Sequence, residues 1–331
     1  MKGVSLILIC IAALVGVSLF SLGIGRYPVP PSAILSWMLT GGSADANLPV
    51  VLLGIRLPRL VAAIAAGGAL SLSGAAYQGL FRNPMVSPDI LGVSSGSGFG
   101  AALGILFSLP MAAVQAISFA GGITAVLAAV LVSRAIGRSS DSVLVLVLSG
   151  IVISSLFGAL LSLLKYIADP LDKLPAITYW LMGSFADIRS GELGMAVAMV
   201  LAGAVPLLLL SWRLNVLSFG EEEARSLGLH TGRMRVAVIV SATLVTASMI
   251  SVCGIIGWVG LVVPHISRFL AGANHRRLMP VSFLVGAAFM VAVDTVARST
   301  ASVEIPVGII TAVLGAPFFI WIMKRSTVRA W

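Results

Sequence analysis

The sequence predicts an all-α integral membrane protein with about ten transmembrane helices and both termini on the cytoplasmic side. Of its 331 residues, 59% are hydrophobic and only 10% are charged, and the mean hydropathy is +1.08. A soluble domain carries about 25% charged residues, so this chain has too few polar groups to cover a surface that faces water. Uncharged stretches of roughly 20 residues, long enough to cross a bilayer as a helix, recur along the chain.

The individual spans are predicted from the stretches between charged residues. Two long stretches are each divided in two, at Leu109-Pro110 and near Cys253-Gly254, because Pro and Gly interrupt helices. All spans belong to a single membrane domain that covers residues 1–331. The ten predicted spans cover residues 3–25, 60–81, 90–108, 110–133, 142–164, 193–212, 236–253, 255–270, 278–293 and 305–323.

The distribution of positive charge decides the orientation. An even number of spans places both termini on one side, and with cytoplasmic termini that side holds about two thirds of the 21 Lys and Arg residues. A net charge of +9 is compatible with binding to nucleic acid, but the basic residues stand singly between apolar runs and act as topology signals. The cations on the outer side therefore need a separate explanation.

Motifs of enzymes and of nucleotide-binding proteins are absent from the sequence. There is no G-x-x-x-x-G-K-[ST] loop and no HExxH, and the three histidines are far apart. Acidic residues fall at span ends rather than within spans, where an ion-coupled transporter places its relays. We expect no cofactor on this chain, and any energy source for transport must lie on another polypeptide.

One polar constellation opens the second span on the outer side. In the segment RLPR, Arg56 and Arg59 present two cations on roughly one face of a helix start, and Arg298 at the outer end of the ninth span adds a third. Arginine suits bidentate pairing with carboxylates of a partner. The alternative is that these side chains anchor the helices at the membrane interface.

The inner loop over residues 214–235 contains a second constellation. Gly220 and Gly228 bracket the segment EEEARSL, a short helical stretch with acids in its first turn. A short amphipathic helix parallel to the membrane is able to transmit force from a soluble partner. The alternative is a solvated connector.

The third constellation joins the second and third spans. In RNPMVSPDILGV, the two prolines prevent a simple helical turn, and Asn83 and Met85 are expected at the inner mouth. The following cluster GVSSGSGFG includes Ser94, Ser95 and Gly96. Its small residues either pack helices closely or line a pathway through a broken helix.

At these residues the sequence resembles the FecCD-type permeases, the membrane subunits of ABC importers for iron-siderophore complexes, haem and vitamin B12. One departure is the sequence Gly254-Ile255-Ile256, where the family often has Gly-Pro-Ile. The matching segments are residues 56–98, WLMGS at 180–184, EARSLG at 223–228, 254–282, DTVAR at 294–298 and 304–323.

The resemblance implies a type II ABC importer permease fold of ten spans in the bacterial inner membrane. It also implies two cytoplasmic ATPase subunits that bind ATP and Mg, an extracytoplasmic substrate-binding protein, and a second permease copy or paralogue. Arg56, Arg59 and Arg298 would dock the binding protein, and Asn83 and Met85 would lie near a cytoplasmic gate, with Ser94, Ser95 and Gly96 along the pathway. The residues implied to couple to the ATPase are Glu223, Ala224, Arg225, Ser226, Leu227 and Gly228.

The residues of these motifs most resemble those of ferric-siderophore permeases, so the expected cargo is an iron chelate that moves inward by alternating access. Haem or vitamin B12 is the alternative cargo for the same machinery. An ion-coupled secondary transporter is the alternative from a different class.

Overall fold

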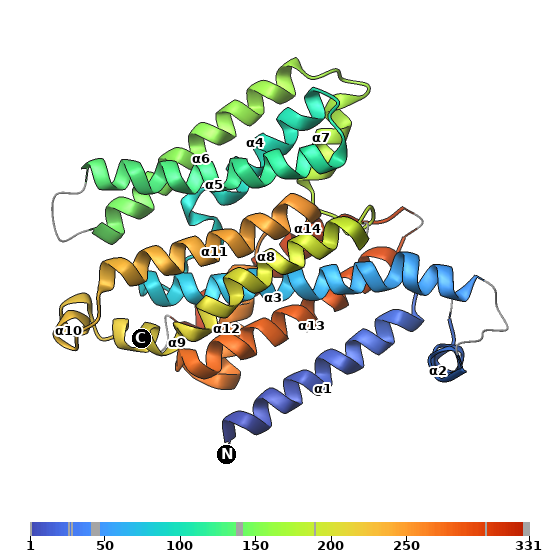
Figure 1. Ribbon diagram of the computed structural model, residues 1–331, viewed down its shortest axis with the longest axis horizontal. Helices are drawn as coiled ribbons and strands as arrows, with labels where there is room; N and C mark the ends of the chain where they lie inside the picture. Colours follow the sequence, from blue (N-terminus) through green and yellow to red (C-terminus); the bar gives the residue numbers. More distant parts are fainter. Residues whose placement is uncertain are drawn as a thin grey trace.

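The computed structural model describes residues 2–25, 27, 29–40, 47–136, 142–188, 190–301 and 303–326, and all regular secondary structure in these ranges is helical (Figure 1). The helices, in chain order, are α1 (Lys2–Gly23), α2 (Pro31–Thr40), η1 (Val50–Arg56), α3 (Leu57–Phe81), η2 (Pro88–Leu91), α4 (Val93–Leu106), α5 (Met111–Ile136), α6 (Ser142–Ile167), α7 (Lys173–Leu181), α8 (Ser190–Leu209), α9 (Ser211–Leu217), α10 (Glu221–Ser226), α11 (Thr231–Cys253), α12 (Val259–Ala271), α13 (His275–Ser299) and α14 (Val307–Ser326).

Each predicted span contains an apolar helix. Seven helical stretches in the described ranges are long and apolar enough to cross a membrane, and α4, α12 and α14 are shorter apolar helices at the other three predicted positions. The largest differences are at the second span, whose helical stretch begins at Val50 and not at residue 60, and at α13, which covers His275–Ser299 where the sequence predicts residues 278–293. Charged residues end the predicted spans, but α13 continues past Asp294 to Arg298, and these charges are compensated there because both Arg59 and Arg298 pair with Asp294.

The start of α1 lies at the same end of the bundle as α9 and α10, and α2 lies at the opposite end (Figure 1). We call the first of these the inner end and the second the outer end. The predicted coupling loop over residues 214–235 is mostly helical: it contains the end of α9, all of α10 and the first turn of α11.

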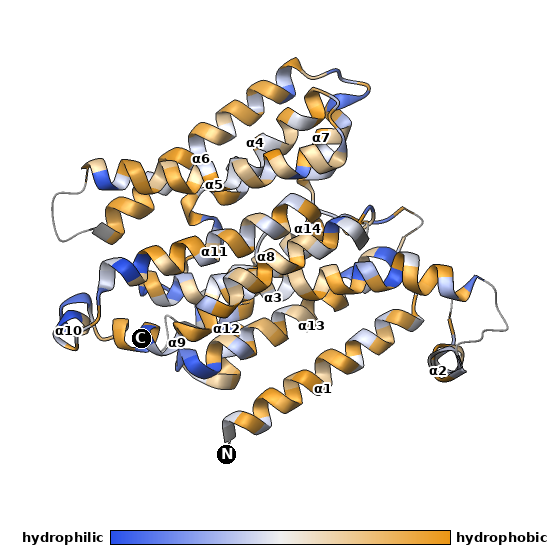
Figure 2. Ribbon diagram, viewed as in Figure 1, coloured by the Kyte–Doolittle hydropathy of each residue, from blue (hydrophilic) through white to orange (hydrophobic). Residues whose placement is uncertain are grey.

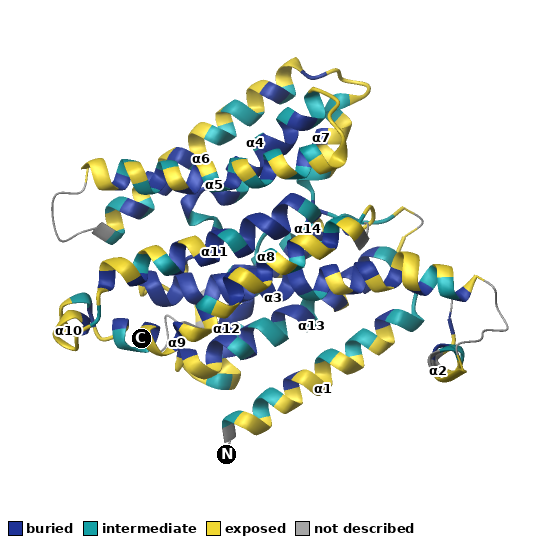
Figure 3. Cartoon of the chain, viewed as in Figure 1, coloured by how far each residue is buried: buried dark blue, intermediate teal, exposed yellow. Residues whose placement is uncertain are grey.

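Helix α3 is the centre of the bundle. Nearly all of its side chains are buried, and α8, α11, α12 and α13 pack around it (Figure 3). A sequence rich in Ala, Gly and Ser has little side-chain volume, so neighbouring helices approach closely. A Cβ on Gly74 would lie 1.8 Å from the carbonyl oxygen of Gly260 in α12, and a Cβ on Gly67 would lie 2.1 Å from that of Gly286 in α13. These contacts fix α3 against two neighbours at backbone distance.

The helices at the periphery expose their apolar side chains. Helix α1 and helix α6 are orange along most of their length in Figure 2, and large residues such as Ile9, Val152 and Leu163 are more than half exposed. A soluble protein does not present such continuous apolar faces, whereas lipid or another transmembrane helix covers them. Helix α6 packs with α4 and α5 in the group drawn at the top of Figure 1.

Three short helices at the outer end, α2, η1 and α7, lie outside the predicted spans. Helix α2 follows the first span, η1 leads directly into α3, and α7 lies between α6 and α8, all in segments that the sequence predicts as outer loops. Ile177 of α7 is buried against Ala102 of α4 and Leu164 of α6, so α7 belongs to the packed bundle. The segment Lys173–Leu181 has nine residues and begins with a lysine, so it is too short to be predicted as a membrane span.

Candidate functional site

Three arginines with a predicted docking role lie together at the outer end. Arg56 is the last residue of η1, Arg59 is in the first turn of α3, and Arg298 is in the last turn of α13. Pro58 suits the start of α3, because the first turn of a helix needs no N–H from that residue. Helices α3 and α13 run in opposite directions, which places the start of one beside the end of the other.

Arg59 is held by two carboxylates of the same chain. Its Nε donates to Asp294 Oδ1 at 2.7 Å and its Nη1 donates to Glu304 Oε2 at 2.9 Å, while Nη2 donates to the second oxygen of Glu304. The side chain of Asp294 is 3% exposed, and its second oxygen lies 3.4 Å from Arg298 Nε. A bidentate, charge-assisted pair of this kind is among the stronger hydrogen-bonded arrangements.

The other two guanidinium groups reach the end of α1. Nη2 of Arg298 donates to Ser21 Oγ at 2.9 Å. The carbonyl oxygens that accept from Arg56 or Arg298 belong to Ser21, Leu22, Ile24 and Tyr27. Carbonyls at the end of a helix have no partner within the helix and carry its partial negative charge, so cations are favourable there. We call Arg56, Arg59, Asp294, Arg298 and Glu304 the outer arginine cluster.

The cations of the outer arginine cluster are largely enclosed by groups of the same chain. Arg56 and Arg59 are only 6% and 7% exposed, because acids and carbonyls of the same chain surround them. Sequence reasoning treated Asp294 and Glu304 merely as acids at span ends. Asp294 and Arg298 are four residues apart, so both lie on the same side of a helix. This spacing is the feature of the sequence that predicts their pairing. The docking role itself stays a prediction.

The segment between α3 and α4 turns sharply at the inner end. Arg82 ends α3 in the left-handed conformation with φ of 49°, and Asn83 Oδ1 accepts a hydrogen bond from Met85 N at 2.9 Å. The carbonyl oxygen of Pro84 lies 3.1 Å from Nε2 of His265 in α12. Asn83 and Met85 are exposed at this turn, as expected of residues at the inner mouth. Their role in a gate stays a prediction.

The Gly/Ser cluster serves mainly to pack α4. A Cβ on Gly96 would lie 2.3 Å from the carbonyl oxygen of Gly121 in α5, so Gly96 is a point of close contact between the two helices. A role of Gly96 along the pathway stays a prediction. Ser94 donates to Asp89 Oδ1 near the start of α4, and both Ser94 and Ser95 are half-buried.

At the inner end, α10 stands outside the spans and carries the predicted coupling residues. Its first carboxylate, Glu221, accepts hydrogen bonds from Arg225 at 2.8 Å and Thr231 at 3.1 Å, and Arg235 Nη2 donates to its second oxygen at 3.0 Å. Arg225 Nε also donates to Thr231 Oγ1 at 3.2 Å. Thr231 and Arg235 belong to the first turns of α11, so these bonds fix α10 to that span.

The charge of Glu221 is stabilised by this arrangement. Partial burial alone would raise the pKa of its carboxyl group, but Arg235, the hydroxyl of Thr231 and Arg225 together lower the pKa below its usual value of 4.5. Glu221 is therefore ionised throughout the neutral range, and the contact between α10 and α11 is present there.

The predicted coupling residues divide into an anchor and an exposed face. Ala224 is fully buried against the bundle core, and therefore attaches α10 to the spans. Glu223, Arg225, Ser226 and Gly228 are exposed, and Leu227 exposes 69% of its surface. Gly228 has φ of 82°, a left-handed conformation that ends the short helix. An exposed leucine beside a charged helix is suited to contact another protein.

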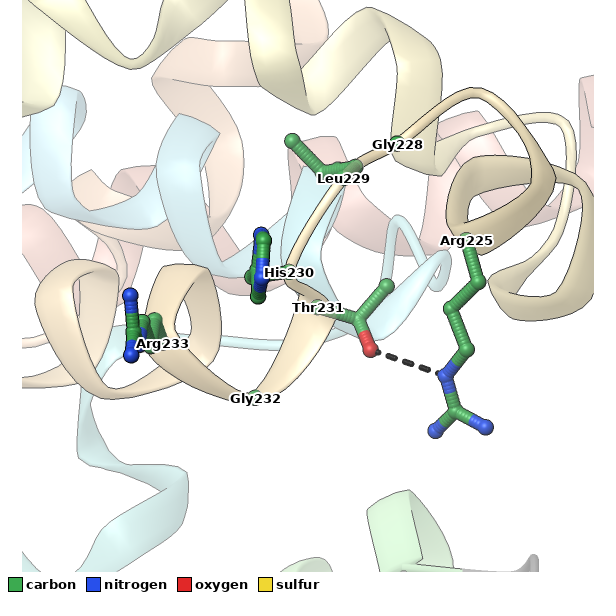
Figure 4. A pocket seen from close by; sticks show the side chains of 7 residues that line it. All are labelled: Arg225, Gly228, Leu229, His230, Thr231, Gly232 and Arg233. Carbon is green, nitrogen blue, oxygen red and sulfur yellow. Dashed lines mark hydrogen bonds between the residues drawn. The ribbon is translucent and has the colours of Figure 1, made fainter.

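A shallow pocket of about 510 Å³ lies where α10 meets α11 (Figure 4). The close-up shows Arg225 bonded to Thr231 on one side, and His230 and Arg233 on the other. Within the described residues, no group of three or more His, Cys, Asp and Glu side chains is placed to hold a metal ion.

Comparisons with known proteins agree on one class. The model of the FecCD transport family matches residues 11–325. The chain is 43% identical to the molybdate import system permease protein MolB of Haemophilus influenzae, over 95% of this chain and 94% of that one. It is 43% identical to the cobalamin import system permease protein BtuC of Halobacterium salinarum, over 83% and 74%. A solved structure described as an inward-facing conformation of a metal-chelate type ABC transporter is 40% identical, with a TM-score of 0.88 over 97% and 99% of the two chains.

Proposed function

Because this chain belongs to the FecCD transport family, a family of ABC transporter permeases, we propose that it is the membrane subunit of an importer driven by ATP hydrolysis on separate subunits. The observation that carries the mechanism is the bonding of α10 to α11. A displacement of the exposed face of α10 moves Glu221, and through Thr231 and Arg235 it moves the inner end of a buried span. The bundle then alternates between outward-open and inward-open states.

The proposed assembly contains partners on both sides of the bacterial inner membrane. Two ATPase subunits bind ATP and Mg at the inner end, a substrate-binding protein docks at the outer end, and a second permease copy or paralogue completes the pathway. The exposed apolar faces of peripheral spans support the pairing with another transmembrane chain. This chain itself is proposed to hold no cofactor.

Docking of the binding protein at the outer arginine cluster needs an exchange of partners. Arg59 is already bonded to Glu304, whose side chain is 20% exposed, whereas Asp294 is 3% exposed. An acidic side chain of the binding protein would compete with Glu304 first. In this proposal the cluster is closed in the structure described here, and docking opens it.

The cargo that we propose is a metal chelate, with a ferric siderophore as the first candidate. The residues of the motifs support an iron chelate. Two relatives that are each 43% identical to this chain are named for molybdate and for cobalamin. Titration of the co-purifying binding protein with ferric siderophores, haem, cobalamin and molybdate identifies the cargo. A ferric siderophore is contradicted if only another compound binds.

The coupling role is tested with the change Leu227→Asp in the complex with ATPase and binding protein. A charge at this exposed apolar contact should reduce cargo-stimulated ATP hydrolysis by roughly tenfold, a loss of about 1.4 kcal/mol at the interface. Leu171→Asp is the matched control, because Leu171 is 93% exposed and lies between α6 and α7 at the outer end. Unchanged stimulation in the Leu227 variant would remove α10 from the coupling path.

A further inference from the structure

A second groove at the inner end lies beside the pocket of Figure 4 and shares Gly228, Leu229, His230 and Arg233 with it. Its volume is about 600 Å³, and it lies between α9 and the first turns of α11. Arg213, His230 and Arg233 form its polar side, and Val216 and Ala237 belong to its apolar side. The groove therefore combines cations with an apolar wall.

The groove lies at the boundary of two spans. Its lining begins at Leu210, directly after α8 ends at Leu209, and it continues to Ala237 within α11. Helical spacing places Val240 on the same face as Arg233 and Ala237, and Val240 is 59% exposed. A molecule with a polar head in the groove would thus have an apolar surface for its tail along α11.

The charges in the groove are free, unlike those next to them. Within the described part of the chain, the side chains of Arg213 and Arg233 form no hydrogen bond and no ion pair, and both are exposed. Arg225 and Arg235, by contrast, are both bonded to Glu221. Glu221, the acid next to the groove, is therefore already paired with Arg225 and Arg235. Arg213 and Arg233 are able to bind an external anion.

An exposed tryptophan in the groove indicates that the groove lies at the level of the lipid headgroups. Trp212 lines it and is 57% exposed. Exposed Trp residues next to span ends gather at the level of the lipid headgroups. Basic pockets between transmembrane helices on the cytoplasmic side are suited to anionic headgroups.

We propose that this groove binds an anionic phospholipid of the cytoplasmic leaflet, with Arg213 and Arg233 holding the phosphate and Ala237 and Val240 contacting an acyl chain. A protein partner that covers the groove is the competing occupant. Leu227 and Gly228, which follow α10, belong to the lining, but most of it comes from α9 and the first turns of α11, where Trp212 and the two free arginines suit a lipid headgroup. The proposal is independent of the cargo.

Native mass spectrometry of the full chain, released from phosphatidylcholine nanodiscs and titrated with phosphatidylglycerol, tests the proposal. The wild-type chain should retain phosphatidylglycerol in preference to phosphatidylcholine. The double change Arg213→Gln with Arg233→Gln should weaken this binding by roughly tenfold or more. Arg276→Gln is the matched control, because Arg276 is also an exposed arginine at the inner end, at the start of α13.

Three outcomes would overturn the proposal: equal retention of both lipids, unchanged phosphatidylglycerol binding in the double variant, or displacement of the lipid by millimolar inorganic phosphate. The last would identify a free-phosphate site. Capture of the ATPase subunit by each variant provides a second readout. If the double variant loses the ATPase and keeps the lipid, the groove is a protein contact. The thermal-unfolding midpoint should stay unchanged in the double variant, since both side chains are exposed and unbonded.

Discussion

The two ends of the bundle use arginine in opposite ways. At the outer end, Arg59 and Arg298 are enclosed and bonded to acids of the same chain. At the inner end, Arg213 and Arg233 are exposed and unbonded within the described residues. The residue type is the same, so the difference comes from where helix ends place carboxylates. The neighbours of a cation near a span end therefore decide whether it stabilises the fold or is able to bind an external anion. Its charge alone does not decide between these roles.

The largest effect is expected from Asp294→Asn. This change removes the charge that lies between two guanidinium groups and leaves both buried cations with less compensation. We expect a loss of about 3 kcal/mol in unfolding free energy, the usual cost of breaking a buried ion pair. A denaturant titration of the detergent-solubilised chain measures it.

Asp172→Asn is the control for that experiment, because the side chain of Asp172 is 72% exposed and its pair with Lys173 is at the surface. Its cost should stay within about 1 kcal/mol. Equal losses in the two variants would mean that burial of the outer arginine cluster contributes nothing to stability.

A smaller loss of unfolding free energy is expected when the arginines at the two ends of α13 are compared. Helix α13 carries Arg276 at its inner start and Arg298 at its outer end. Arg298→Gln removes an ion pair and hydrogen bonds to the end of α1, and should cost about 2 kcal/mol. Arg276→Gln should stay within about 0.5 kcal/mol. Thermal unfolding of both variants sharpens the comparison, and a reversed order would contradict it.

The smallest effect is a pH dependence of the contact between α10 and α11. The pKa of Glu221 is lowered in the folded chain, so its contribution is complete above the ordinary pKa of 4.5 and is lost as the pH falls through the folded value. The protection factors of residues 221–235 in hydrogen exchange, taken relative to the intrinsic rate at each pH, should therefore fall below about pH 4.5. Glu221→Gln should exchange faster already at pH 7, whereas Glu222→Gln, a change at an exposed neighbour, should behave as the wild type.

The spans were predictable because their signal is local. Long apolar stretches, Leu109-Pro110 and Cys253-Gly254 place the helices and their breaks, and the bracketing glycines 220 and 228 place α10. The partners of Arg59 were not predictable in this way. They lie 235 and 245 residues further along the chain, and only the packing of α3 against α13 brings them together. The role of Gly96 was open for the same reason, since its contact at Gly121 depends on how α4 and α5 cross.

Transport by reconstituted vesicles tests the central claim most directly. The chain is incorporated with and without its ATPase subunits, the loaded binding protein is supplied on the outer side, and accumulation of a ferric siderophore or another chelate is followed. We predict accumulation that requires both ATP and the ATPase subunits and does not respond to an imposed ion gradient. Accumulation by this chain alone, driven by such a gradient, would contradict the account.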